Sequence, residues 1–386
     1  MTEKSHRDTY AYVDETVHRL RATAALLGIS ENTLRTTLVE SKIEVKRVSP
    51  TKPKTPAIRI FDLPTIFRIA EYRRNRHLTK KPEGKMPVVI SVQIIKGGTG
   101  KTTTSSELTV LLQLMGLKVL GIDIDIQANY TQLMGYEADL EKKDAEKYGL
   151  TKKAIVDGTF ATICGPVVEK NLSQVDASAI IKYPFGPCGP AIIPSDTFCS
   201  DLEFAISKSS GKRELVFQKF LRESISGKIL GLNVGDFDVI LFDCPPSISF
   251  VSTNALACAD IVIAPVKMES FSVKGLSRLM SEINTLCDEY PGEVSGPELI
   301  ILPTYYTKNL PRVDRMSKTL MKFHALTSPI AIGQSEEFPK STCNYMPLTV
   351  QRPTSPAVNE YRVFADFLRD KIIEISKKKK TGEGIS

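Results

Sequence analysis

A glycine-rich loop between an apolar run and a helical pattern constrains the fold of this chain more than any other feature. The apolar run VVISVQII covers residues 88–95, the loop continues as KGGTGKT over residues 96–102, and a helical pattern over 102–115 stops at Gly116. A continuous apolar run indicates a buried strand, and glycines at a strand-to-helix turn let backbone N–H groups face phosphate oxygens. The stretch therefore predicts a phosphate-binding loop.

Strand and helix patterns alternate through the rest of the chain. The further apolar segments that we interpret as strands are residues 118–125, 191–194, 237–246, 259–266 and 298–306. Strands that alternate with helices form parallel sheets covered on both faces. The pattern predicts an α/β fold, a doubly wound and mostly parallel sheet of the P-loop NTPase kind, with the loop and the acidic strand ends at one edge.

The loop departs from the usual pattern G-x-x-x-x-G-K-[ST], because Ile95 stands where the first glycine belongs and a second lysine, Lys96, follows it. In nucleoside-triphosphate sites, Lys101 would reach the β- and γ-phosphates and Thr102 would offer its hydroxyl to Mg²⁺. Asp243 ends a predicted strand, where its carboxylate can hold the metal through water. The candidate cradle residues are Lys96, Gly97, Gly98, Thr99, Gly100, Lys101, Thr102 and Thr103.

Positive charge is concentrated in the N-terminal quarter of the chain. Residues 1–86 hold 18 Lys and Arg against 10 Asp and Glu, a net charge of +8, whereas the remainder holds 33 against 34, a net charge of −1. This asymmetry suggests a nucleic-acid-binding module attached to a near-neutral body. A solvated basic face is the alternative interpretation.

Residues 19–43 have the arrangement of a helix-turn-helix. Gly28 would supply the turn, Ser30 would cap a second helix, and Leu34 and Leu38 would face inward. The outward face would present polar side chains to a major groove: Asn32, Thr33, Arg35 and Thr36. Lys46 and Arg47 would begin a basic wing with a Pro-rich tip. A small helical unit that serves only dimerisation is the alternative.

A third helix is expected after the wing, with Asp62 as its N-cap and Pro64 in its first turn. The domain boundaries that we predict are an N-terminal helix over 1–22, a winged helix-turn-helix domain with its linker over 23–86, and an ATPase domain over 87–386. The segment 78–87 is expected to be the linker, because its Pro, Gly and Lys content cannot support a core. The stripe along the first helix, Tyr10, Val13, Val17 and Leu20, would pair with its copy in a dimer or pack back on the same chain.

The start of the chain has no signal-peptide pattern and no apolar run approaches the ~20 residues of a membrane span. The seven cysteines form no C-x-x-C pair, which suits a reducing compartment. We therefore expect a cytoplasmic protein.

The segments KGGTGKTTTS, GIDIDIQANYTQ and 237–276 together resemble the ParA family of partition ATPases, which belongs to the deviant Walker A group. The resemblance spans about residues 88–370, and the helix-turn-helix ahead of it is similar to the long, plasmid-type subgroup. It implies ATP and Mg²⁺ as cofactors, a homodimer, a centromere-binding partner of the ParB type, nucleoid-associated DNA binding and repression of its own operon.

The resemblance also implies roles for single residues. Lys96 would cross the dimer interface toward the partner's ATP, Asp125 would orient or activate the attacking water, and Gln127 would lie beside the γ-phosphate. Asp123 and Asp243 would serve the Mg²⁺ shell. The family commonly has proline where this chain has Ile126, so the turn after Asp125 is expected to be less rigid. Candidates for a sequence-independent DNA surface are Lys308, Arg312, Arg315, Lys340 and Arg352.

Other functions share parts of this pattern. A MinD-like membrane ATPase has the same loop, and the C-terminal segment 359–380 combines apolar positions at helical spacing with a lysine run. Tyr361, Phe364, Phe367 and Leu368 nevertheless favour a terminal helix that is docked on the core. An iron–sulfur reductase of the group would need a pair of cluster cysteines. A repressor whose nucleotide site is only allosteric stays open.

Overall fold

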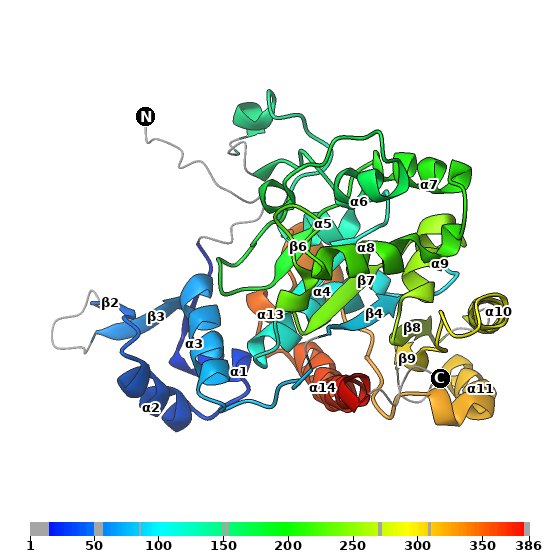
Figure 1. The fold of residues 1–386 in the computed structure, drawn as a ribbon. Helices are drawn as coiled ribbons and strands as arrows, with labels where there is room; N and C mark the ends of the chain where they lie inside the picture. Colours follow the sequence, from blue (N-terminus) through cyan, green and yellow to red (C-terminus); the bar gives the residue numbers. More distant parts are fainter. Residues whose placement is uncertain are drawn as a thin grey trace.

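The computed structural model describes residues 15–49, 57–84, 86–148, 150, 154–268, 272–307 and 310–381, and its centre is a parallel sheet (Figure 1). Among these residues the sheet has six strands in the order β6-β5-β7-β4-β8-β9, and every neighbouring pair is parallel. Five of these six strands lie inside segments that the sequence predicts, and β8 runs one residue past the predicted segment 259–266. The bounds are β4 Val88–Val92, β5 Val119–Asp123, β6 Ala191–Ile193, β7 Val239–Asp243, β8 Ile261–Lys267 and β9 Glu298–Thr304.

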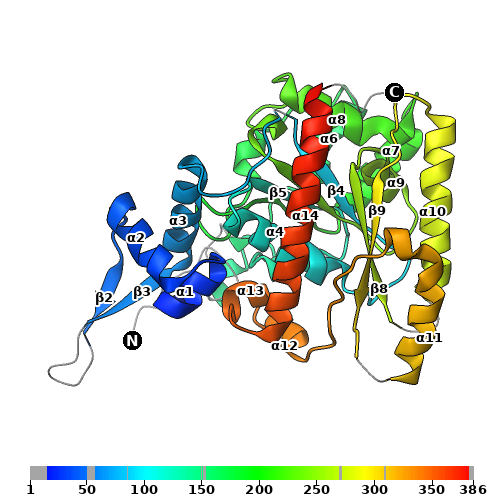
Figure 2. The same ribbon diagram turned by 90° about the horizontal axis from the view of Figure 1, so that it is seen from below.

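Helices cover both faces of this sheet, as a doubly wound fold requires. Alternate side chains of a strand point to opposite faces, so Val88 and Ile90 pack with α4 (Lys101–Leu114) and α14 (Pro356–Thr381). Figure 2 shows α14 crossing this face. Leu120, Ile122 and Phe242 instead pack under the opposite layer. That layer contains α6 Phe160–Val168, α7 Cys199–Lys208, α8 Val216–Ile225 and α9 Phe250–Ala257, with α10 Ser272–Glu289 and α11 Pro311–Leu320 beside β8 and β9.

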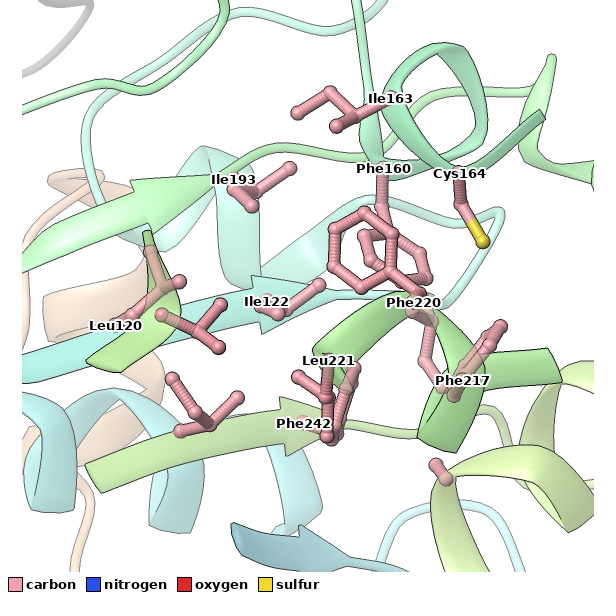
Figure 3. Packing of buried hydrophobic residues seen from close by; sticks show 14 of the residues in the cluster. Leu120, Ile122, Phe160, Ile163, Cys164, Ile193, Phe217, Phe220, Leu221 and Phe242 are labelled. Atoms are coloured by element: carbon pink, nitrogen blue, oxygen red, sulfur yellow. The ribbon is translucent and has the colours of Figure 1, made fainter. Parts of the chain in front are cut away.

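Aromatic rings fill the centre of the second layer (Figure 3). The ring of Phe160 meets the rings of Phe217 and Phe220 edge-on, with centroids 4.9 and 5.1 Å apart. Phe217 stacks on Phe242 of β7 at 5.6 Å. Edge-to-face and offset pairs add to the free energy gained from burial alone. This cluster fixes the position of β7, the strand that ends at Asp243.

The N-terminal segment forms two helices, a hairpin and a third helix. α1 (Leu20–Leu26) turns at Gly28, whose φ is 62°, into α2 (Glu31–Ser41), where the Ser30 hydroxyl accepts the N–H of Thr33. β2 (Lys46–Val48) pairs antiparallel with β3 (Ile58–Asp62), and Asp62 caps α3 (Leu63–Asn75). The predicted turn, both caps and the buried positions of Leu34 and Leu38 are confirmed; the Pro-rich tip lies outside the described residues.

The prediction of one helix over residues 1–22 is wrong for residues 17–19. Val17–Arg19 form β1, which pairs antiparallel with β3, and α1 begins at Leu20, so the predicted boundary at residue 22 falls inside a helix. The alternation of strand side chains explains the difference: Val17 and Arg19 are exposed, and the His18 ring is buried and bonds the Val350 carbonyl oxygen at 2.8 Å. This part packs on its own chain, while Tyr10 and Val13 lie outside the described residues.

The N-terminal elements share a hydrophobic core with the body of the protein. Phe67 of α3 stacks on Phe185, with ring centroids 5.5 Å apart. Arg74 of α3 pairs with Asp238, which directly precedes β7, and donates to the carbonyl oxygen of Gly116 at 2.6 Å. Arg362 of α14 donates to the Leu26 carbonyl oxygen at 3.1 Å. The module is therefore docked rather than tethered.

The predicted linker over 78–87 lies along α14. Pro82 is buried, the Gly84 N–H donates to the Ser376 hydroxyl at 3.2 Å, and the Lys379 ammonium donates to the Pro87 carbonyl oxygen at 3.0 Å. The predicted terminal helix is confirmed, since Tyr361, Phe364 and Leu368 are buried and Phe367 packs beside them. The remaining short α-helices are α5 Asn129–Leu133, α12 Glu337–Cys343 and α13 Leu348–Gln351.

Candidate functional site

The glycine-rich loop leaves the carboxyl end of β4 and leads into α4. Gly98 and Gly100 have φ values of 67° and 90°, a region that favours glycine. A Cβ added at Gly97 or Gly98 would meet no atom within 4 Å. On the other side of the loop, Thr304 of β9 donates its hydroxyl to the Thr99 carbonyl oxygen at 2.8 Å. The bond from Thr304 therefore fixes the loop on the side of β9, while the space beside Gly97 and Gly98 is open.

The two lysines of the loop differ in environment. Lys101 is buried, and its ammonium donates to the carbonyl oxygen of Lys96 at 3.4 Å. Burial lowers the pKa of Lys101, and the nearby charges of Asp243 and Asp125 oppose that change. The side chain of Lys96 is half-buried at the edge of the loop. A buried cation at the start of a helix gives the loop a strong preference for an anion.

Asp243 joins the first turn of α4 to the end of β7. Its carboxylate accepts the Thr102 hydroxyl at 2.9 Å and the Ser105 hydroxyl at 2.6 Å. Burial raises its pKa, although Ser105, Lys101 and Thr102 favour the ionised form. Carboxylate and hydroxyl oxygens are ligands that Mg²⁺ accepts, so Thr102 and Asp243 form a suitable donor pair.

Asp123 lies next to Asp243, its partner in the register of the sheet, and is fully buried. One of its oxygens accepts the Asp125 N–H at 3.1 Å. The other accepts the Thr131 N–H at 3.0 Å and the Thr131 hydroxyl at 2.7 Å. Burial and the charge of Asp243 raise its pKa well above the usual range. In this geometry Asp123 braces the turn after β5, and its part in a metal shell stays a prediction.

Asp125 sits in that turn, with 7% of its surface exposed. Its carboxylate accepts the Gln127 N–H at 3.0 Å, and its carbonyl oxygen accepts the Ala128 N–H at 2.9 Å. The turn is thus closed by hydrogen bonds although Ile126 replaces the expected proline. Gln127 is exposed beside it. The structure brings Lys101, Asp125 and Asp243 together at one edge of the sheet.

The loop also leaves a polar atom without a partner. The hydroxyl oxygen of Thr99 is buried and has no hydrogen-bond partner among the described residues. Buried hydroxyls without partners are rare in folded proteins. Together with the open backbone at Gly97 and Gly98, this atom fits a loop that closes around phosphate oxygens.

Sequence reasoning missed several residues of this site. Ser105 and Thr131 hold the two buried carboxylates, and both lie in helical segments whose pattern gives no sign of a polar contact. Tyr305 has a φ of 53° and its ring lies 3.8 Å from the Cβ position of Gly100. The ammonium of Lys267 lies over that ring, 4.8 Å from its centroid. The position of Tyr305 at the end of a predicted strand was the available signal.

The predicted DNA-facing residues of the N-terminal module are exposed. On α2 these are Asn32, Thr33, Arg35 and Thr36, and on β2 they are Lys46 and Arg47. The Arg35 guanidinium bonds the side chains of Asn32 and Glu31 at 2.9 and 3.2 Å. The six residues therefore lie on the surface, on adjacent elements.

The other basic candidates lie apart from the module. Lys340 and Arg315 are exposed, and exposed Arg352 pairs with Glu337 at 2.8 Å. Lys308 and the side chain of Arg312 lie outside what the structure describes. At the end of α14, Lys378, Lys379 and Lys380 each pair with a carboxylate. Within the described ranges, no helix has the length and apolar character needed to cross a membrane.

Comparisons with known proteins match the part of the chain that contains this site. A family model described as an AAA domain matches residues 87–295. The chromosome partitioning protein ParA of Caulobacter vibrioides is 29% identical over 195 residues, which cover 50% of this chain and 61% of that protein.

Two solved structures resemble the fold. One, described as a partition protein, has a TM-score of 0.59 at 15% identity and covers 94% of this chain and 93% of that chain. The other is cobyrinic acid a,c-diamide synthase from Mycobacterium smegmatis, with a bound ATP analog and magnesium. It has a TM-score of 0.55 at 22% identity and covers 78% of this chain and 98% of that chain.

Proposed function

Since the chain belongs to the AAA domain family and is a ParA-type partition ATPase, we propose that it hydrolyses ATP with Mg²⁺ to segregate a low-copy DNA molecule, such as a plasmid. The open glycine loop with its buried lysine and unpartnered Thr99 hydroxyl carries this proposal. Lys101→Ala should abolish ATP binding, because Lys101 is the buried cation of the cradle. Titration with a fluorescent ATP analogue checks this, and undiminished affinity would refute the cradle.

The residues at the sheet edge divide the chemistry between them. Thr102 and Asp243 would hold Mg²⁺, which neutralises phosphate charge when bound. The loop N–H groups from Gly97 to Thr103 would bind the phosphates, and Asp125 would orient the attacking water. Gln127 would lie beside the terminal phosphate. Asp123 would keep the turn that carries Asp125 in place.

Lys96 is the residue that we assign to the dimer. A second lysine from a facing subunit would neutralise charge on the γ-phosphate, so nucleotide binding and dimerisation become one event. Lys96→Ala should still bind nucleotide through Lys101 but fail to dimerise with ATP and Mg²⁺. Lys96→Arg should not restore the dimer, because a planar guanidinium differs in shape from an ammonium. Analytical ultracentrifugation checks both variants, and a dimer as tight as that of the wild type would contradict the assignment.

We assign operator recognition and autorepression to the N-terminal module. Exposed Arg35, between Asn32 and Thr36 on α2, supports this assignment. If Arg35 pairs with guanine, Arg35→Ala should cost roughly 1 to 3 kcal/mol on the cognate operator. Footprinting on the promoter of the partition operon measures this, and an unchanged footprint after deletion of residues 1–86 would leave the module with no part in recognition.

The partner would be a centromere-binding protein of the ParB type, and the ATP-bound dimer would coat nucleoid DNA through exposed basic residues such as Lys340 and Arg352. ATP turnover with and without DNA separates this function from that of a repressor with a purely allosteric nucleotide site. A MinD-like role has less support, because three of the four lysines at the end of α14, Lys378 to Lys380, are paired with carboxylates. Sedimentation with anionic liposomes tests that alternative.

A further inference from the structure

An arginine-lined cleft opens on the surface of the N-terminal module. Its volume is about 410 Å³, and its described lining contains no carboxylate and no aromatic ring. Its arginines come from five different elements, and they are Arg19 of β1, Arg21 of α1, Arg35 of α2, Arg47 of β2 and Arg59 of β3. Sequence analysis singled out two of the five, Arg35 and Arg47.

Most of these cations have no carboxylate partner in the part of the chain that the structure describes. Among the described residues, Arg35 pairs with Glu31 at 3.2 Å, whereas Arg19, Arg21, Arg47 and Arg59 form no ion pair. Elsewhere, Arg74 and Arg352 are each matched by an acidic side chain. Guanidinium groups gathered in one depression repel one another, so the cleft is suited to an anion with several negative charges.

We propose that this arginine cleft grips the phosphate backbone of duplex DNA, independently of sequence and of nucleotide at the P-loop. The inference rests on the proposed DNA-facing role of the module, but it adds Arg19, Arg21 and Arg59 to Arg35 and Arg47 and requires no nucleotide. Guanidinium forks match phosphate oxygens in pairs. A single strand would need aromatic rings on which its bases stack, and the cleft has none among its described lining residues.

The position of the cleft connects it with α2 and separates it from the P-loop. Arg35 belongs both to the cleft and to the outward face of α2, so a backbone held in the cleft lies beside the helix that faces a groove. Figure 2 shows β2 and β3 at the outer edge of the module, with α3 between them and α4. The charge of the cleft therefore does not depend on what the P-loop holds.

The test measures binding to a random-sequence duplex without nucleotide, by fluorescence anisotropy. Arg21→Gln/Arg47→Gln alters exposed side chains and should lower affinity about tenfold or more at low salt. The slope of log affinity against log salt should become shallower by about 2, close to one phosphate contact per arginine. Arg222→Gln/Arg278→Gln, with the same charge change on exposed positions of α8 and α10, should leave both quantities unchanged. Lys101→Ala should bind the duplex as the wild type does.

Several results would overturn the proposal. They are wild-type affinity and slope in Arg21→Gln/Arg47→Gln, loss of duplex binding in Lys101→Ala, or a single strand that binds as tightly as the duplex. Arg19→Gln/Arg59→Gln repeats the test with two other arginines of the cleft, with thermal unfolding as the check on folding. If these variants weaken random duplex while the wild type shows no preference for an operator, the cleft stands and the proposed operator recognition fails.

Discussion

Asp125 is the residue whose chemistry depends most on the turn around it. Its carboxylate already accepts the Gln127 N–H, so removing it alters both the turn and the proposed site of the attacking water. Asp125→Ala should keep ATP affinity while hydrolysis falls by ~10²-fold or more, the range expected for loss of a general base. Asp125→Asn keeps the shape and an acceptor oxygen but should be nearly as slow. Phosphate release at saturating ATP measures turnover, and a wild-type rate in either variant would assign Asp125 another role.

The Thr131 hydroxyl supports a different carboxylate. It donates to Asp123 at 2.7 Å inside the core, and a buried acceptor that loses its donor costs about 1 to 3 kcal/mol. Thr131→Val also removes the acceptor of the Ser195 N–H, so it should lower the free energy of unfolding by at least that amount with little change in volume. Thr131→Ser keeps the hydroxyl and should stay closer to the wild type. Urea denaturation compares them, and equal stabilities of all three proteins would show that this bond contributes nothing.

At the scale of elements, α4 lies in the core but has several polar side chains, and these form hydrogen bonds with neighbouring helices. Thr104 bonds the hydroxyl of Tyr361 at 2.9 Å, and Thr109 bonds the hydroxyl of Tyr130 at 2.9 Å. Glu107 accepts the N–H groups of Leu348 and Thr349 at the start of α13. The helix that begins in the P-loop is thus fastened along its length to α5, α13 and α14.

Burial gives Glu107 a measurable pH dependence. It raises the pKa of this carboxyl from 4.5 to about 7, against the hydrogen bonds from Thr349 and Leu348. Between these values the folded state holds the proton more tightly than the unfolded chain does. The stability gained is full below about pH 4.5 and is lost as the pH rises to about 7.

The free energy of unfolding of the wild type, relative to Glu107→Gln, should therefore fall by up to about 3 kcal/mol across this range. Parallel urea titrations at several pH values give the difference, and because both proteins share all other titrating groups, those contributions cancel. A difference that stays constant with pH would mean that Glu107 is ionised in the folded protein throughout.

At the scale of the whole molecule, Arg74 joins the N-terminal module to the ends of two elements of the site. It contacts Gly116 just after α4 and Asp238 just before β7, whose opposite ends carry Lys101 and Asp243. Arg74 and Asp238 are 14% and 11% exposed, and removing one partner of a buried pair costs about 3 kcal/mol or more.

Arg74→Met should therefore lower thermal stability and speed proteolytic cleavage between residues 76 and 87. Arg68→Met, an exposed position on the same helix, is the matched control and should behave as the wild type does. Wild-type stability and an unchanged cleavage rate in Arg74→Met would mean that the module is held without this pair.

Local signals made most of the body predictable. The apolar runs located each strand of the parallel sheet, and Gly116, Ser30 and Asp62 marked helix ends correctly because caps and stops depend on neighbouring residues. The sequence pattern did not predict β1, because a three-residue strand depends on pairing with β3, more than forty residues away in the chain. The support of Glu107 also comes from distant residues, Leu348 and Thr349. The Pro, Gly and Lys content of 78–87 gave no sign that Pro82 is buried.

The docked linker along α14 has a geometric consequence. If α2 reads DNA in a dimer as proposed, a flexible tether would let the two α2 helices bind half-sites at any spacing. A fixed module instead sets their distance and relative rotation through the fold itself. In a two-fold dimer, the spacing of the half-sites would then have to match the pitch of the double helix. Half-sites shifted by half a helical turn would face opposite sides of the duplex. A fixed linker could not bend, so the two α2 helices would not reach both half-sites.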